Sequence, residues 1–208
     1  MYEDPITKAF EALEAELYQA VGKMIATWSQ VESWLAHLLT LLLFRNGTGR
    51  QGETIYYAVQ NINPRLKIVE AALFSRTDIA PEIRSQFKKI IKKIEYEASE
   101  RNNIIHGDFI RGSVSDSEIA IAISPKIFSD MKRLKPPAGV KKLGYDTADI
   151  RRHIERISNL RDALWALYGD IPDAKDSKPP KSSKEYLAAW QESRAQCEWP
   201  SINRRSED

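Results

Sequence analysis

The sequence is poor in the residues that build cross-linked or metal-bound folds. Its 208 residues include a single cysteine, Cys197, and three histidines. One cysteine excludes an internal disulfide and a cysteine-rich zinc site, and it fits a reducing, intracellular compartment. No two histidines have the spacing of metal ligands, and the carboxylates are scattered. Because a Gly-rich phosphate loop is also missing, we expect neither a metal nor another cofactor.

Long apolar segments and a strong net charge are missing as well. The longest apolar stretch, Trp34–Phe44, is interrupted by His37 and Thr40 and falls short of the roughly 18 residues that suggest a membrane span. The first residues, Met-Tyr-Glu-Asp-Pro, are acidic and contain no apolar signal core. The 31 basic and 29 acidic residues leave a net charge of +2, so any nucleic-acid contact must come from a local patch. We therefore expect a cytoplasmic protein that does not enter a membrane.

Apolar residues three and four positions apart predict that the first half of the chain is helical. The first series follows Pro5, continues for more than 30 residues and is ended by Asn46-Gly47-Thr48-Gly49. A second helical region covers about 54–75. Pro64 interrupts it, so we expect a break near Asn63, which can cap the second half.

Two more helices are predicted further along the chain. Pro81 opens a third helix, and Gly107 is placed to stop it. A last long helix begins near Thr147, with either Asp146 or Thr147 as its N-cap. Its apolar residues again repeat every three or four positions as far as Leu167.

Alternating β-branched residues predict a short hairpin between the last two helices, formed by residues 108–111 and 119–123. Helices with one apolar face must pair these faces, so we expect an all-α, up-and-down bundle of four to five helices. The hairpin is inserted before the last long helix. The bundle should cover 1–170, and 171–208 reads as a flexible tail rich in Pro, Lys and Ser, with a short helix over 184–196.

The only concentrated functional signal is the segment Arg101-Asn102-Asn103-Ile104-Ile105-His106-Gly107. Steps of three and four along the third helix place Arg101 on the face that its isoleucines occupy. Because arginine is rarely buried without a partner, we expect an interface or an acidic partner there. Glu32 lies on or beside the apolar stripe of the first helix and is a plausible ion-pair partner.

The position of His106 bears on how the site is assembled. Five helical residues separate it from Arg101 by about 140° of rotation, whereas Asn102 lies close to His106 in angle. Arg101 and His106 therefore converge only if the helix end is distorted near Gly107, or if two chains share one site. The second arrangement requires a dimer.

These residue types suit cleavage of RNA without a metal. A neutral histidine exchanges a proton near pH 7, and the planar guanidinium of arginine stabilises developing phosphate charge. His106 would act as acid or base while RNA's own 2′-hydroxyl attacks, Arg101 would hold the phosphorane, and Asn102 would orient His106 or a phosphate oxygen.

Arg101-Asn102 followed by His106 resembles the Arg-x4-His motif of the HEPN superfamily. The likeness extends through Gly107-Asp108-Phe109, and Trp28-Ser29-Gln30-Val31-Glu32 is similar to the Trp-x-x-x-Glu stretch of HEPN-like bacterial proteins. The resemblance covers roughly 20–168. No accompanying nucleotidyltransferase domain is present in the chain.

The resemblance implies a helical homodimer in which two motifs line one cleft. Many relatives are metal-independent endoribonucleases of toxin–antitoxin, phage-defence and CRISPR-linked systems, whereas others are inactive modules that bind nucleic acid or protein. It places Arg101 and His106 in catalytic positions, Asn102 in a supporting one and Glu32, less directly, in the catalytic set. An RNA substrate and an antitoxin or regulatory protein are the implied partners.

Simpler interpretations remain open at this point. Arg101 could form only a structural salt bridge, with His106 near the last helical carbonyls, and Glu32 is as easily a purely structural partner. Trp28 fits the core better than substrate stacking. The third helix also carries Lys88, Lys89, Lys92 and Lys93, which form either a solvated face or a phosphate-binding one.

Overall fold

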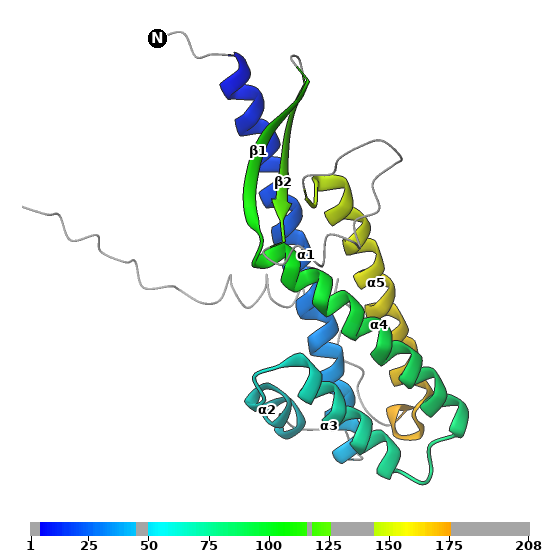
Figure 1. Ribbon diagram of the computed structural model, residues 1–208. Coiled ribbons are helices and arrows are strands. Elements are labelled where there is room, and N and C mark those ends of the chain that lie inside the picture. Colours follow the sequence, from blue (N-terminus) through cyan, green and yellow to red (C-terminus); the bar gives the residue numbers. More distant parts are fainter. Residues whose placement is uncertain (1–4, 45–49, 116–117, 126–143, 176–208) are drawn as a thin grey trace, which may run out of the picture. The chain divides into compact units, whose positions relative to one another are not determined.

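The computed structural model describes residues 5–44, 50–115, 118–125 and 144–175, all within one compact unit (Figure 1). This part of the chain is mostly helical, with a two-stranded antiparallel hairpin before the last long helix, which confirms the predicted fold class. The expected short helix at 184–196 lies outside the described residues. The elements are α1 (Pro5–Leu43), α2 (Gln51–Ala58), α3 (Ile62–Ser75), α4 (Pro81–Ile105), β1 (Asp108–Ser115), β2 (Glu118–Ser124), α5 (Thr147–Asp170) and a 3-10 helix (Pro172–Lys175).

The core forms around α1, which packs against α2, α3 and α5. Figure 1 shows α1 in blue running beside the yellow α5, with α4 crossing in front. Each helix buries the stripe that its periodicity predicts. A fully buried leucine or isoleucine contributes about 1.5–3 kcal/mol. The fully buried members include Leu17, Met24, Val31, Leu35, Leu39, Leu66, Leu73, Ile94, Ile150, Ile157 and Leu167.

The break in the second helical region lies earlier than the sequence suggested. The chain leaves α2 after Ala58 and enters α3 at Ile62, so the N-cap is Asn61 and the expected cap at Asn63 is wrong. Pro64 lies in the first turn of α3. Proline is tolerated there because a first-turn N–H has no helical acceptor to lose.

The start of α5 has a complete capping box. Asp146 accepts a hydrogen bond from the Asp149 N–H at 2.8 Å, and the Asp146 N–H donates to the Asp149 carboxylate at 3.2 Å. Of the two caps that the sequence left open, Asp146 is therefore the one used. Such caps stabilise a helix start by about 1 kcal/mol.

The hairpin lies along the N-terminal half of α1 (Figure 1). Phe109 of β1 stacks on Tyr18 of α1, with ring centroids 5.5 Å apart. On the other side of the ladder, Ile123 exchanges backbone hydrogen bonds of 2.9 and 2.8 Å with Tyr145. The chain therefore returns to the hairpin immediately before α5, a pairing that no sequence pattern predicted.

Gly107 joins the end of α4 to β1 through a close approach of backbone. Its φ is not in the left-handed region, so the expected helix-stopping conformation is not the reason for glycine here. A Cβ at this position would lie 2.4 Å from Ile123 Cγ2 and 2.7 Å from the carbonyl oxygens of Asn103 and Ser124. Only a residue without a side chain fits between the helix end and β2.

Replacement of Gly107 with Ala should therefore lower the free energy of unfolding by about 1–3 kcal/mol, since backbone must move to admit a methyl group. The matched control is Gly22→Ala in α1, where a Cβ meets nothing within 4 Å and alanine should add about 0.5–1 kcal/mol. Chemical denaturation of both variants measures the difference. Equal stability of Gly107→Ala and the parent chain would contradict the close approach.

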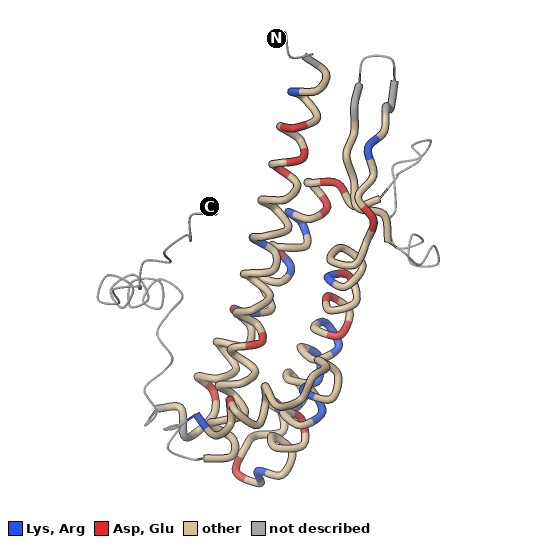
Figure 2. Tube along the Cα trace, turned by 90° about the vertical axis from the view of Figure 1, so that its left-hand side faces the viewer, with Lys and Arg blue, Asp and Glu red and all other residues tan. Residues whose placement is uncertain are grey.

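Packing continues past Asp170 into the 3-10 helix, where Ile171 and Ala174 are buried. Within the described ranges, no helix has the length and apolarity needed to cross a membrane. Figure 2 shows Lys and Arg interleaved with Asp and Glu along the helices. Charge of one sign therefore gathers only locally, as the near-neutral composition implies.

Candidate functional site at the end of α4

Arg101 is half-buried and faces α1, as its position on the apolar stripe predicted. Its Cζ lies 6.0 Å from the ring centroid of Trp28, and its Nη1 donates a 2.9 Å hydrogen bond to Asn102 Oδ1. The Nε atom is buried and finds no acceptor in the described part of the chain. A buried donor without an acceptor costs about 1–3 kcal/mol, so the placement of Arg101 lowers the stability of the fold.

Glu32 does not pair with Arg101, and the expected ion pair between them is wrong. Its carboxylate accepts a 2.8 Å bond from Arg65 Nη1, and Arg65 Nε donates to the carbonyl of Val59 at 2.6 Å. Arg65 reaches Glu32 because α3 packs against α1. The positive charge of Arg101 therefore has no carboxylate partner among the described residues.

The arginine of the Glu32–Arg65 pair lies against two aromatic rings. The Arg65 Cζ lies 5.0 Å from the ring centroid of Tyr56 and 5.4 Å from that of Tyr57. Burial raises the pKa of Tyr56, whose side chain is fully inaccessible. This cluster fixes α2 and α3 to α1, and we assign Glu32 to it rather than to the candidate catalytic set.

Glu32→Ala should lower the free energy of unfolding by about 2 kcal/mol, because it leaves the Arg65 charge enclosed without its counter-ion. That value lies between those for exposed and fully buried pairs. The control is Glu14→Ala, which removes the partner of Arg111 on the surface and should cost less than about 1 kcal/mol. Urea denaturation measures the free energy of unfolding of both variants. Equal losses would show that the Glu32–Arg65 pair stabilises the fold no more than an exposed pair does.

His106 and Asn102 are exposed at the end of α4. His106 is the C-cap residue, with φ −100° and ψ 4°, and its backbone N–H donates to the Asn102 carbonyl at 3.0 Å. Asn102 therefore contacts Arg101 with its side chain and His106 with its backbone. Because α4 is helical as far as Ile105, about 140° of rotation still separates Arg101 from His106.

The four lysines offered as candidates for RNA binding have different neighbours in the structure. Lys88 lies over Phe74 of α3, with Nζ 4.7 Å from the ring centroid. Lys89, Lys92 and Lys93 instead line a groove between α4 and α5 with a volume of about 580 Å³. The candidate RNA-binding lysines therefore have different surroundings, with one lysine against α3 and three at the groove.

A buried acid–base cluster that the sequence analysis missed lies beside this groove. His153 Nδ1 is 2.7 Å from one Glu97 carboxylate oxygen, and Arg156 Nε donates to the other at 2.8 Å. Glu97 and His153 are 5% and 1% exposed. Burial alone would raise the pKa of Glu97, but the hydrogen bonds from His153 and Arg156 outweigh it and hold that pKa below its usual value. The sequence hinted at this cluster only through position, because Glu97 and His153 both lie on the apolar stripes of their helices.

The lowered pKa of Glu97 predicts acid sensitivity. Its ionised form stabilises the fold above the ordinary value of 4.5, and this contribution is lost as the pH falls through the lower, folded-state pKa. Glu97→Gln should therefore be less stable at pH 7 and lose less stability than the parent chain between pH 5 and pH 3. Melting curves across this range test the effect; parallel pH dependence of the two proteins would contradict it.

His37 also acquires partners that the sequence did not reveal. Its Nδ1 lies 3.0 Å from Glu53 of α2, and its Nε2 is 3.3 Å from Ser33 Oγ. Burial lowers the pKa of His37 in spite of Glu53. A serine beside a histidine could in principle act as a nucleophile in acyl transfer. Ser33, however, lies inside the continuous helix α1, whose backbone N–H groups are taken by helical hydrogen bonds. No neighbouring amide could therefore stabilise the oxyanion that acyl transfer forms. We assign this chain of contacts to the α1–α2 interface.

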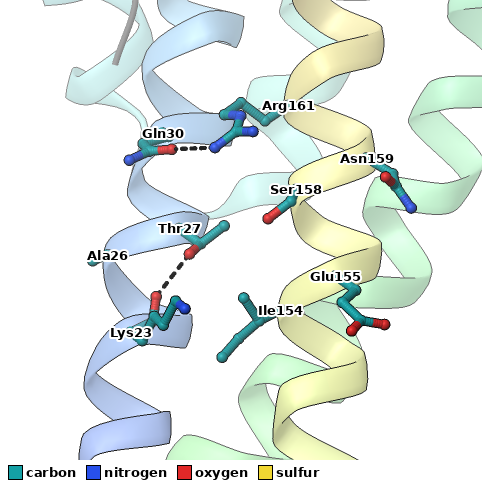
Figure 3. A pocket seen from close by; sticks show the side chains of 9 residues that line it. All are labelled: Lys23, Ala26, Thr27, Gln30, Ile154, Glu155, Ser158, Asn159 and Arg161. Carbon is teal, nitrogen blue, oxygen red and sulfur yellow. Dashed lines mark hydrogen bonds between the residues drawn. The ribbon is translucent and has the colours of Figure 1, made fainter. Parts of the chain in front are cut away.

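A second hollow, of about 530 Å³, lies between α1 and α5. Figure 3 shows Gln30 and Arg161 meeting across it, joined by a 3.0 Å hydrogen bond, while the Thr27 hydroxyl donates to the Lys23 carbonyl at 2.8 Å. These polar groups satisfy one another. In the part of the chain that the structure describes, no three His, Cys, Asp or Glu side chains come together as metal ligands would.

Comparison of the chain with protein-family models, with curated proteins and with solved structures gives no match. The candidate site therefore rests on the geometry of Arg101, Asn102 and His106 and on the motif that they form.

Proposed function

We propose that the protein is an HEPN-like, metal-independent endoribonuclease that acts as a homodimer on single-stranded RNA. The observation that carries this proposal is the state of Arg101. Its guanidinium is held by Trp28 and Asn102, has no carboxylate partner in the described chain, and precedes the exposed His106 by little more than one helical turn.

The chemistry needs only an acid–base group and a fixed cation. His106 takes the proton of the ribose 2′-hydroxyl, whose oxygen attacks the adjacent phosphorus. The bond to the 5′-oxygen breaks, that oxygen receives a proton from His106 through solvent water, and the other product ends in a 2′,3′-cyclic phosphate. Arg101 binds the phosphorane with its planar donors, and Asn102 orients Arg101 through the hydrogen bond already present.

Two copies of the chain account best for the directions of the two side chains. Arg101 faces α1 while His106 is exposed at the helix cap, so a single copy does not aim both at one phosphate. The exposed Ile25, with 40% of its surface accessible, lies on α1 three residues before Trp28. An apolar residue beside the motif gives a second copy a surface to bury.

Incubation with labelled single-stranded RNA in the presence of EDTA tests the proposed reaction. We expect cleavage, a 2′,3′-cyclic phosphate on the upstream product, and no cleavage at a linkage whose 2′-hydroxyl is methylated. Inhibition by EDTA, or cutting of the methylated linkage, would contradict the mechanism. Binding of RNA without cleavage would instead support the alternative function, a catalytically silent HEPN-like binding module.

A further inference from the structure

The groove between α4 and α5 has the composition of a site for nucleotide units. Cations lie along it, Tyr96 stands at its side with 48% of its surface exposed, and buried Ile90 and Leu160 are among its apolar residues. Basic side chains that follow a backbone, combined with an aromatic face for bases, are the usual components of single-strand binding.

The lysines of the groove lack counter-ions in the part of the chain that the structure describes. None of Lys89, Lys92 and Lys93 has an ion-pair partner within the described ranges. Exposed arginines elsewhere on the same helices do find carboxylates, including Arg151 with Glu16. An uncompensated row of charges raises the local concentration of an anionic ligand.

The carboxylate in the groove does not cancel these charges. Glu97 is one of the lining residues, but its two oxygens contact His153 and Arg156, and Arg156 lines the groove as well. The Glu97 and Arg156 charges offset each other, so the three lysines set the sign of the groove. The α1–α5 hollow has no such row of lysines: its charged lining residues are Lys23, Glu155 and Arg161, and Arg161 is bonded to Gln30 and Asp162.

We propose that this groove binds the phosphates and bases of a single RNA strand outside the cleavage motif. The choice of RNA as the strand rests on the proposed function, whereas binding itself requires no cleavage. Lys93 and Arg101 are eight residues apart on α4, which is about 12 Å along the helix axis. A strand held by the lysines and stacked on Tyr96 can therefore continue to the motif.

The test measures binding of the full-length protein to a fluorescent 12-nucleotide RNA that is fully 2′-O-methylated and so cannot be cut. Lys89→Gln/Lys93→Gln should weaken binding at least tenfold and reduce the salt dependence by about 1.4, two phosphates at about 0.7 each. The control, Lys67→Gln/Lys88→Gln, removes the same charge from exposed positions outside the groove and should change the Kd less than twofold.

A further variant and a competitor complete the test. Tyr96→Leu keeps an apolar side chain but removes the stacking face, and should weaken binding about tenfold. Equal effects of the two lysine pairs, or no effect of Tyr96→Leu, would overturn the groove assignment. Displacement of the oligonucleotide by equimolar AMP would show that a free nucleotide is the ligand and overturn the strand assignment.

The two proposals fail in different ways. If His106→Ala binds the methylated RNA as tightly as the parent chain and the lysine pair does not, the groove assignment stands even where no cleavage is found. If RNA is cleaved but the two lysine pairs behave alike, the endoribonuclease proposal stands and the groove assignment falls.

Discussion

His106→Ala should reduce cleavage of single-stranded RNA by at least 10²-fold to 10⁴-fold, the usual contribution of a general acid or base. His106 is exposed at the C-cap of α4, and only its backbone N–H contacts the helix, through the Asn102 carbonyl. Alanine retains that N–H. The melting temperature should therefore change by no more than a degree or two, because exposed substitutions usually cost under about 0.5 kcal/mol.

Initial rates of cleavage under EDTA measure this effect, with the melting temperature as the control for folding. His37→Ala is the matched histidine variant. It removes the imidazole that contacts Glu53 and Ser33 at the α1–α2 interface, so it should lower stability and leave cleavage within a few-fold at a temperature where the protein is folded. Unchanged cleavage by His106→Ala would remove the histidine from the mechanism.

The second large effect is expected at Arg101, and its sign differs for activity and for stability. Arg101→Met keeps an unbranched stem against Trp28 but removes the guanidinium. Loss of a fixed donor to the phosphorane should reduce cleavage by about 10²-fold to 10³-fold. Because the buried Nε has no acceptor in the described chain, its removal should leave the melting temperature unchanged or raise it.

Arg65→Met provides the comparison, since that arginine bonds Glu32 and the Val59 carbonyl. It should melt at a lower temperature, because a half-buried carboxylate loses its counter-ion. A charged side chain that has no stabilising partner is typical of a functional site, where activity is gained at the expense of stability. If Arg101→Met melted well below the parent chain with its activity intact, the arginine would be structural.

Periodicity alone predicted the helices well because each buries one stripe on its neighbours. The first series of apolar residues corresponds to α1, and Pro81 begins α4 as expected. Local chemistry also narrowed the N-cap of α5 to Asp146 or Thr147, and the structure has Asp146. These features depend on residues within one turn of one another, where spacing and side-chain type determine the outcome.

Contacts between distant segments could not be read from spacing. The sequence suggested Arg101 as the partner of Glu32, and only the packing of α3 beside α1 brings Arg65 to it instead. The close fit of Gly107 against Ile123 could not be predicted either, because it depends on β2 packing beside the end of α4. His153 gave no functional signal in the sequence because its partner, Glu97, lies 56 positions earlier on another helix.

The motif itself was the part of the candidate site that sequence could identify. Arg101, Asn102 and His106 are neighbours in the chain, so their common helix end followed from the helix prediction. The different surroundings of the four lysines could not be predicted from the sequence. On one helix, Lys88 and Lys89 are adjacent in sequence but point to Phe74 and to the α4–α5 groove, respectively.

Complementation between two inactive variants tests the shared site most directly. Arg101→Met and His106→Ala subunits are mixed under conditions of subunit exchange, and cleavage is compared with that of either variant alone. If each site takes its arginine from one copy and its histidine from the other, a heterodimer contains one intact site, and the equimolar mixture should recover about a quarter of the parent activity. A mixture no more active than its components, although heterodimers have formed, would contradict a site built from two copies of the chain.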